Sequence, residues 1–184
     1  LVEPVREAWR ELDLGNNALK DFLARYGKYL RPIDHRDRLD EMLWRGKTAA
    51  ANRTLPLVSD GWRKLADARI RLREGRGGVD RAIDAVPAEL RDDPGLLYER
   101  IRWRRQRGMV TGARELLFEA PPKPEFEALW WRERSWHIRE ALDAGNVEDA
   151  YLLAASHVQR GGVAFAEAEW LAGWIALRFL GRPE

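Results

Sequence analysis

The sequence predicts an all-α protein that consists of stacked antiparallel helix hairpins, and three observations lead to this prediction. Apolar residues recur at the spacing of an α-helix along almost the whole chain of 184 residues. No segment shows the sustained alternation of a β-strand or an Asn-Gly hairpin turn. Glycine and proline interrupt the helical pattern often, and short helices joined by tight turns pack as antiparallel neighbours.

The expected helices follow one another with only short connections. In chain order they cover residues 5–13, 17–26, 33–45, 48–55, 60–74, 79–86, 94–107, 110–118, 125–144, 147–158 and 164–180. Asp92 and Asp93 stand directly before Pro94, which suits the first helical position, so we interpret this acidic pair as the N-terminal cap of helix 94–107.

The breaks between these helices recur in phase. Turn glycines are expected at Gly46, Gly77, Gly108, Gly145 and Gly181, in steps of 31, 31, 37 and 36 residues. A small residue lies inside the helix after each of the first four turns, at Ala50, Ala82, Ala113 and Ala150. Three of these second helices end at a proline, namely Pro56, Pro87 and Pro121. This pattern predicts a superhelical array of α-hairpins whose period is close to that of tetratricopeptide repeats. The alternative is an irregular helical bundle, because a chain with 15 glycines repeats some spacings by chance.

The last expected helix, within "EWLAGWIALRFLGRPE", is apolar on almost every side. Trp170 and Trp174 share one face, and a stripe of alanines lies on another. A helix of this kind is buried on more than one side, so we expect both tryptophans to be heavily buried and truncation of either to alanine to cost about 3–5 kcal/mol. Gly181 and Pro183 indicate that a further helix follows. Residues 1–184 are therefore interpreted as one partial superhelical domain, truncated at its C-terminus and able to self-associate through the cut edge.

Composition excludes several classes of function. The chain has no cysteine, which excludes disulfides, thiol catalysis and zinc bound by cysteine. The 32 basic residues nearly balance the 30 acidic ones, so no nucleic-acid partner is expected. The most apolar run, 170–177, is far shorter than the roughly 18 residues that span a membrane.

The residues that could carry chemistry form no catalytic, metal-binding or cofactor-binding pattern. His35, His137 and His157 are the only histidines, and none belongs to a helical metal motif. His35 has aspartates on both sides, but we interpret it as an exposed polar residue. Neighbouring carboxylates such as Asp40 and Glu41 point apart on a helix, and "REGRGGVD" at 73–80 lacks the Lys-Ser/Thr of a phosphate loop.

Two stretches suggest binding. In "RIRWRRQRG", Arg100, Arg104 and Arg107 fall within about 60° on the helical wheel. Arginines interleaved with aromatic residues can bind nucleic acid, but pairing with carboxylates of adjacent helices is the favoured interpretation. The second stretch, "LWWRERSWHIRE" at 129–140, holds three tryptophans that either stack on sugar rings or, as we favour, anchor one helix to another.

Three segments carry a resemblance to a known family. "RWRRQRG", "WWRERSWHIREAL" and above all "AEAEWLAGWIALRFLGRPE" are similar to the superhelical domain of soluble lytic murein transglycosylases from Gram-negative bacteria. The resemblance extends from "RLDEMLWRGKTAAANRTLPLV" at 38–58 to the end of the chain. Family members join a region of stacked α-hairpins to a lysozyme-like catalytic domain, which cleaves the MurNAc–GlcNAc bond and leaves a 1,6-anhydro sugar.

The resemblance implies a scaffold and not an active site. The Glu-Ser and Gly-Leu-Met-Gln-like motifs of the catalytic domain are absent, since no Glu-Ser pair occurs and Met42 and Met109 are the only methionines. The parent would be a periplasmic enzyme, and this stretch a non-catalytic region that holds or orients glycan strands for the missing catalytic domain. Arg100, Arg104 and Arg107 are its candidate peptidoglycan contacts. The alternative is a tetratricopeptide-like module that binds a protein partner.

Overall fold

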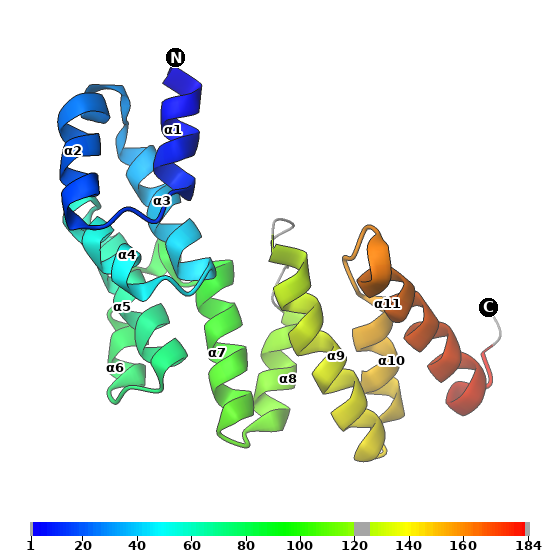
Figure 1. Cartoon of the computed structure of the whole chain (residues 1–184). Coiled ribbons are helices and arrows are strands. Elements are labelled where there is room, and N and C mark those ends of the chain that lie inside the picture. The colour runs from blue at the N-terminus through cyan, green and yellow to red at the C-terminus, as the bar shows by residue number, and fades with distance from the viewer. Residues whose placement is uncertain (1, 120–125, 183–184) are drawn as a thin grey trace. The chain divides into compact units, whose positions relative to one another are not determined.

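A computed structural model describes residues 2–119 and 126–182, and within these ranges it contains helices and no strand. The helices, labelled in Figure 1, are α1 (Val2–Glu11), α2 (Asn16–Tyr26), α3 (Pro32–Trp44), α4 (Thr48–Thr54), α5 (Asp60–Glu74), α6 (Val79–Asp84), α7 (Pro94–Gln106), α8 (Val110–Glu119), α9 (Glu127–Asp143), α10 (Val147–Ala155) and α11 (Gly162–Ile175). Short 3-10 turns follow α2, α4 and α6, and a π-helical turn, Ala176–Leu180, extends α11. The all-α prediction is therefore confirmed.

The turns between helices use glycine where the backbone becomes left-handed. Gly46, Gly108, Gly145 and Gly181 have φ between 61° and 76°, a conformation that side chains with a Cβ rarely adopt. The connection after α5 differs from the expectation, because its left-handed residues are Gly75 and Gly78 and not Gly77. Asp93 caps α7 as expected, since its Oδ1 accepts a hydrogen bond of 2.8 Å from the backbone N–H of Leu96. The expected stop at Pro121 lies outside the described residues.

The described helices belong to two compact units, Leu1–Glu99 and Arg100–Glu184. In the first unit α3 contacts α1, α4 and α5, and α5 contacts α6. The core between α3, α4 and α5 consists of large side chains such as Leu39 and Met42 from α3, packed against Ala50, Ala51 and Ala66. The alanines let the helices approach closely, which is the role that the sequence pattern predicts for Ala50.

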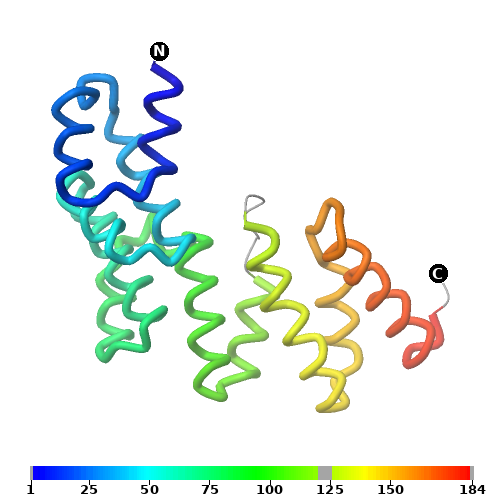
Figure 2. The backbone as a smooth tube through the Cα atoms, viewed as in Figure 1, coloured from blue at the N-terminus to red at the C-terminus, as the bar shows by residue number. Residues whose placement is uncertain are grey.

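In the second unit α10 lies between α9 and α11, and Figure 2 shows the short turn that joins α9 to α10. The buried faces consist of Trp130, Ile138 and Ala141 on α9, Ala150, Leu153 and Ala154 on α10, and Ala168, Leu171 and Ile175 on α11. Ala113 and Ala150, at the expected small positions of α8 and α10, are fully buried.

The expectation that Trp170 and Trp174 are heavily buried is wrong. Their exposed fractions are 62% and 38%, and Leu177 and Phe179 are also exposed. The cause is that α11 packs on its neighbours through Ala168, Leu171 and Ile175, on the other side of the helix. An apolar pattern all round a helix thus yields one buried face and one open face in this unit.

Candidate functional site

Arginine–glutamate pairs connect alternate helices along the chain. Arg73 of α5 binds Glu99 of α7, with Nε at 2.7 Å from Oε1. Arg105 of α7 binds Glu133 of α9 through two parallel hydrogen bonds of 2.6 and 3.1 Å. Arg139 of α9 binds Glu167 of α11. We call these three contacts the arginine–glutamate series.

The series has a regular basis in the sequence. Glu99, Glu133 and Glu167 are separated by 34 residues each, and Arg105 and Arg139 follow the first two of them by six residues. Six residues correspond to about 240° on a helix, so the glutamate of one helix faces the preceding hairpin while its arginine faces the following one. Glu99 and Glu133 are almost fully buried, which makes their arginine partners necessary to the fold.

Arg69 forms a second buried contact, within the first unit. Its guanidinium is 2% exposed, lies 2.7 Å from Asp40 of α3 and 3.4 Å from Asp93, and stacks over the ring of Trp44. It also fills the space beside Gly95, where an added Cβ would come within 2.1 Å of the guanidinium carbon. Glycine at position 95 therefore makes room for this buried cation.

The three candidate glycan contacts, Arg100 and Arg104 on α7 and Arg107 directly after it, have different surroundings. Arg104 donates a hydrogen bond of 2.7 Å to the backbone oxygen of Gly112, and Arg107 lies over the ring of Trp103. Arg100 is half-buried, and its pKa is lowered first by burial and then by the positive charge of Arg104. The structure therefore brings Arg100 and Arg104 together, while Arg107 sits against an aromatic ring.

Two of the three tryptophans in 129–140 serve as anchors between helices, as we favoured. Trp130 is fully buried, and Trp131 donates a hydrogen bond of 2.8 Å from Nε1 to Glu167 of α11. Trp136 is partly exposed instead, with the guanidinium of Arg105 5.2 Å above its ring.

The histidines form no catalytic arrangement. Nδ1 of His157 accepts a hydrogen bond from the backbone N–H of Gln159, so the ring proton is on Nε2, which donates to Glu169 at 2.7 Å. Both ring nitrogens are thus occupied in holding the α10–α11 connection against α11. Within the described ranges no three His, Cys, Asp or Glu side chains could hold a metal ion together.

The other two histidines are buried to different degrees. His137 is fully buried, and burial together with the charges of Arg114 and Arg105 lowers its pKa to about 4. His35 was expected to be an exposed polar residue, and this is wrong. Its ring is half-buried edge-on against Trp9, with centroids 5.3 Å apart, and burial lowers its pKa.

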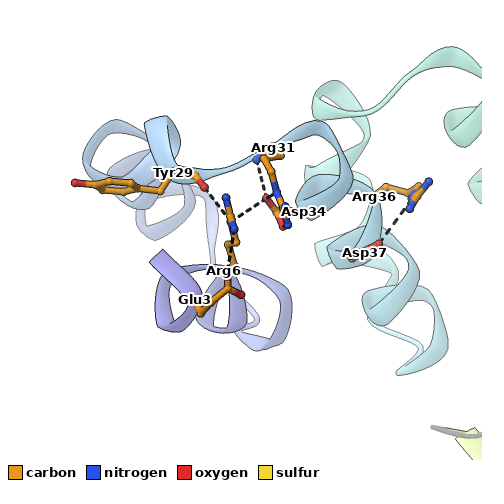
Figure 3. A network of polar contacts seen from close by, with 7 residues as sticks. All are labelled: Glu3, Arg6, Tyr29, Arg31, Asp34, Arg36 and Asp37. Carbon is orange, nitrogen blue, oxygen red and sulfur yellow. Dashed lines mark hydrogen bonds and ion pairs between the residues drawn. The ribbon is translucent and has the colours of Figure 1, made fainter. Parts of the chain in front are cut away.

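A polar cavity between α1 and the start of α3 has no counterpart among the sequence predictions. It has a volume of about 240 Å³ and is lined by charged residues of both signs: Glu3, Arg6, Glu7, Arg10, Arg31, Asp34 and Asp37. Figure 3 shows Arg6 and Arg31 converging on Asp34, whose two oxygens accept bonds of 3.1 and 3.0 Å from Arg31. These contacts lower the pKa of Asp34. Arg6 pairs with Glu3 and Asp34, and Arg31 also pairs with Asp34, so the network holds α1 and the chain before α3 against the start of α3.

The open side of α11 exposes several large apolar side chains. Trp170 and Trp174 stack in parallel, with ring centroids 5.7 Å apart and planes inclined by 10°, and Phe179 meets Trp174 edge-on. Leu177 is 62% exposed, and an added Cβ on Gly173 would meet no atom within 4 Å. We call Trp170, Gly173, Trp174 and Leu177 the α11 face.

Comparison with known proteins adds no relative, because no family model, curated protein or solved structure matches this chain. Among the described helices, none combines the length and the apolar character needed to cross a membrane.

Proposed function

We propose that this chain is a non-catalytic helical scaffold, as its resemblance to the superhelical region of soluble lytic murein transglycosylases suggests. The arginine–glutamate series supports the proposal, because one repeated contact links α5 to α7, α7 to α9 and α9 to α11, as stacked hairpins would require, and the charged side chains in it have structural roles. The parent protein is then a periplasmic enzyme, and a lysozyme-like domain outside residues 1–184 cleaves the glycan strand. This chain alone should release no anhydro-muropeptides from purified sacculi, and release of such products would contradict the proposal.

In this proposal the hairpins stack as one superhelical array. A compact protein of this length has a radius of gyration of about 16 Å. An array of hairpins is longer in one direction, so small-angle X-ray scattering should give a value above about 20 Å. A value near that of a compact globule would leave the chain all-α but exclude the array.

The scaffold contributes weak contacts to glycan-linked peptide stems through Arg100, Arg104 and Arg107. Arg100 lies close enough to Arg104 for the two positive charges to repel, although burial is the larger cause of the lowered pKa of Arg100, and carboxylates of the stems could neutralise this pair. Exposed ion pairs contribute about 0.2–1 kcal/mol each and weaken with salt, so binding should be weak at low salt and absent at high salt.

Co-sedimentation with sacculi tests these arginines. Changing all three to alanine should weaken binding about three- to 150-fold, because three contacts together contribute about 0.6–3 kcal/mol. The control changes Arg10, Arg25 and Arg81, which are exposed, and so removes the same charge elsewhere. If both triple variants bind like the parent chain, Arg100, Arg104 and Arg107 have no role in binding.

A second candidate function is a tetratricopeptide-like protein-interaction module, and the α11 face favours it. Soluble proteins rarely leave several large apolar side chains together in solvent without a partner. The two candidates differ in their salt dependence, because contacts of the apolar face should persist at high salt whereas the arginine contacts should not.

A further inference from the structure

We propose that the polar cavity between α1 and the start of α3 binds a free basic α-amino acid such as lysine. The cavity lies within the first unit, and all its lining residues come from the segment 3–37. Its volume of about 240 Å³ is that of about eight water molecules in the liquid. This space suits a molecule of about ten non-hydrogen atoms, the size of lysine, because larger ligands occupy sites of roughly 300–1,000 Å³.

The wall of the cavity is held in place by contacts within the protein. Asp34 is 7% exposed, and its carboxylate accepts hydrogen bonds from the backbone N–H of Arg31 at 2.7 Å and from the guanidinium of Arg31 at 3.1 and 3.0 Å. Arg6 donates at 3.2 Å to the backbone oxygen of Tyr29 and lies 3.4 Å from the same carboxylate (Figure 3). Side chains that are already ordered in this way lose little conformational entropy when a ligand binds.

The remaining charged groups of the cavity still have capacity for a ligand. Among the described residues Glu7 has no ion-pair partner, and Asp37 has only Arg36, at 3.7 Å. Arg10 is paired within this part of the chain only with Glu11, at the long distance of 4.0 Å. Two carboxylates and one guanidinium group therefore line the same cavity with acceptors and donors that are free to bind a ligand.

The charges of the cavity indicate the class of the ligand. Groups of both signs line it, so a molecule with both an ammonium group and a carboxylate is more complementary than an ion of one sign. Four carboxylates and three guanidinium groups leave one net negative charge, which favours a ligand with one net positive charge. A basic α-amino acid meets both conditions. Its ammonium groups bind Glu7 and Asp37, and its carboxylate binds Arg10.

Titration of the ¹⁵N-labelled chain with L-lysine, followed by heteronuclear NMR at constant pH and ionic strength, tests the proposal. A ligand of this size in a cavity partly open to solvent should bind with a Kd of about 1 mM. L-Glutamate is the matched control ligand, because it has as many non-hydrogen atoms as lysine and the opposite net charge. It should bind at least about tenfold more weakly. Pentane-1,5-diamine lacks the carboxylate and should bind several-fold more weakly than lysine.

Two substitutions test which residues bind the two ends of the ligand. Glu7→Gln removes a charged acceptor at almost constant shape and should weaken lysine binding about three- to tenfold. The matched control is Glu89→Gln, because Glu89 is an exposed carboxylate of the same unit outside the cavity, and it should leave the Kd unchanged. Arg10→Gln should weaken the binding of lysine and not that of pentane-1,5-diamine. Circular dichroism checks that each variant keeps its helices.

Any of four results would overturn the inference. Unchanged spectra at about 20 mM lysine would exclude the site. Equal affinities for lysine and glutamate would show that the net charge of the cavity has no role. Equal affinities for lysine and the diamine would exclude recognition of the carboxylate. Equal effects of Glu7→Gln and Glu89→Gln would place the bound lysine elsewhere. None of these ligands contains a glycan, so the scaffold proposal is tested separately.

Discussion

The helices α9 and α11 each carry a pair of tryptophans, but the two pairs lie in opposite surroundings. Trp130 and Trp131 of α9 are buried, whereas Trp170 and Trp174 of α11 are exposed by 62% and 38%. The two helices can be compared position by position at the 34-residue spacing of their glutamates. Arg139, Glu140 and Asp143 of α9 then correspond to Gly173, Trp174 and Leu177 of α11. Polar residues that suit solvent and ion pairing on α9 are thus replaced on α11 by an apolar surface. The difference shows that a helical apolar pattern predicts a helix well but predicts burial only where a neighbouring element exists.

The largest expected effect is that of Trp130→Ala. Trp130 is fully buried, so its truncation leaves a cavity and should lower the free energy of unfolding by about 3–5 kcal/mol. Urea denaturation followed by circular dichroism measures the loss. A loss below about 1 kcal/mol would mean that the environment of α9 differs little from that of α11.

The next largest effect is expected in the arginine–glutamate series, where the losses of stability on removing a buried and an exposed arginine can be compared. Arg105→Ala leaves the carboxylate of Glu133, which is 1% exposed, buried without its partner and should cost about 3 kcal/mol. Arg139→Ala removes an exposed pair, with side chains 55% and 36% exposed, and should cost less than about 1 kcal/mol. Equal losses in chemical denaturation would contradict the difference in burial between the two pairs.

A smaller effect concerns the pH dependence of stability through His137 of α9. Its pKa is about 4 in the folded protein and 6.5 when exposed, so between these values the unfolded state binds more protons. Stability should therefore fall by about 2–3 kcal/mol as the pH drops from about 6.5 to about 4. Replacement of His137 by phenylalanine should remove this slope. Asp34 also makes stability depend on pH, but in a lower range. Its pKa lies below the usual 3.8, so its stabilising negative charge is lost only at lower pH than the protonation of His137.

The smallest effect is expected for Trp170→Ala. The ring is largely in solvent, so thermal unfolding at about 1 µM should show a change within about 0.5 kcal/mol. A loss comparable to that of Trp130→Ala would show that another part of the chain covers this ring.

Much of the fold could be predicted from the sequence, because its determinants are local. Glycine at left-handed turns, the Asp93 cap before Pro94 and alanines at close helix contacts act within one hairpin, and all three are observed. The exposure of Trp170 could not be predicted, since it depends on what packs against α11. The polar cavity beside α1 could not be predicted either. Arg6 and Asp34 form an ion pair although they are 28 residues apart, and no repeated spacing in the sequence indicates this contact. The arginine–glutamate series was missed although its 34-residue spacing was visible.

The opposite orientation of glutamate and arginine on α7 and α9 has a consequence for how such a chain can grow. Each of these helices carries an acceptor toward the hairpin before it and a donor toward the hairpin after it. A tandem duplication of one such hairpin would therefore meet an opposite charge at both new junctions, and no like charges would be buried together. Chains of this design can gain or lose a unit in evolution without creating an electrostatic defect, whereas reversal of a single unit would create two.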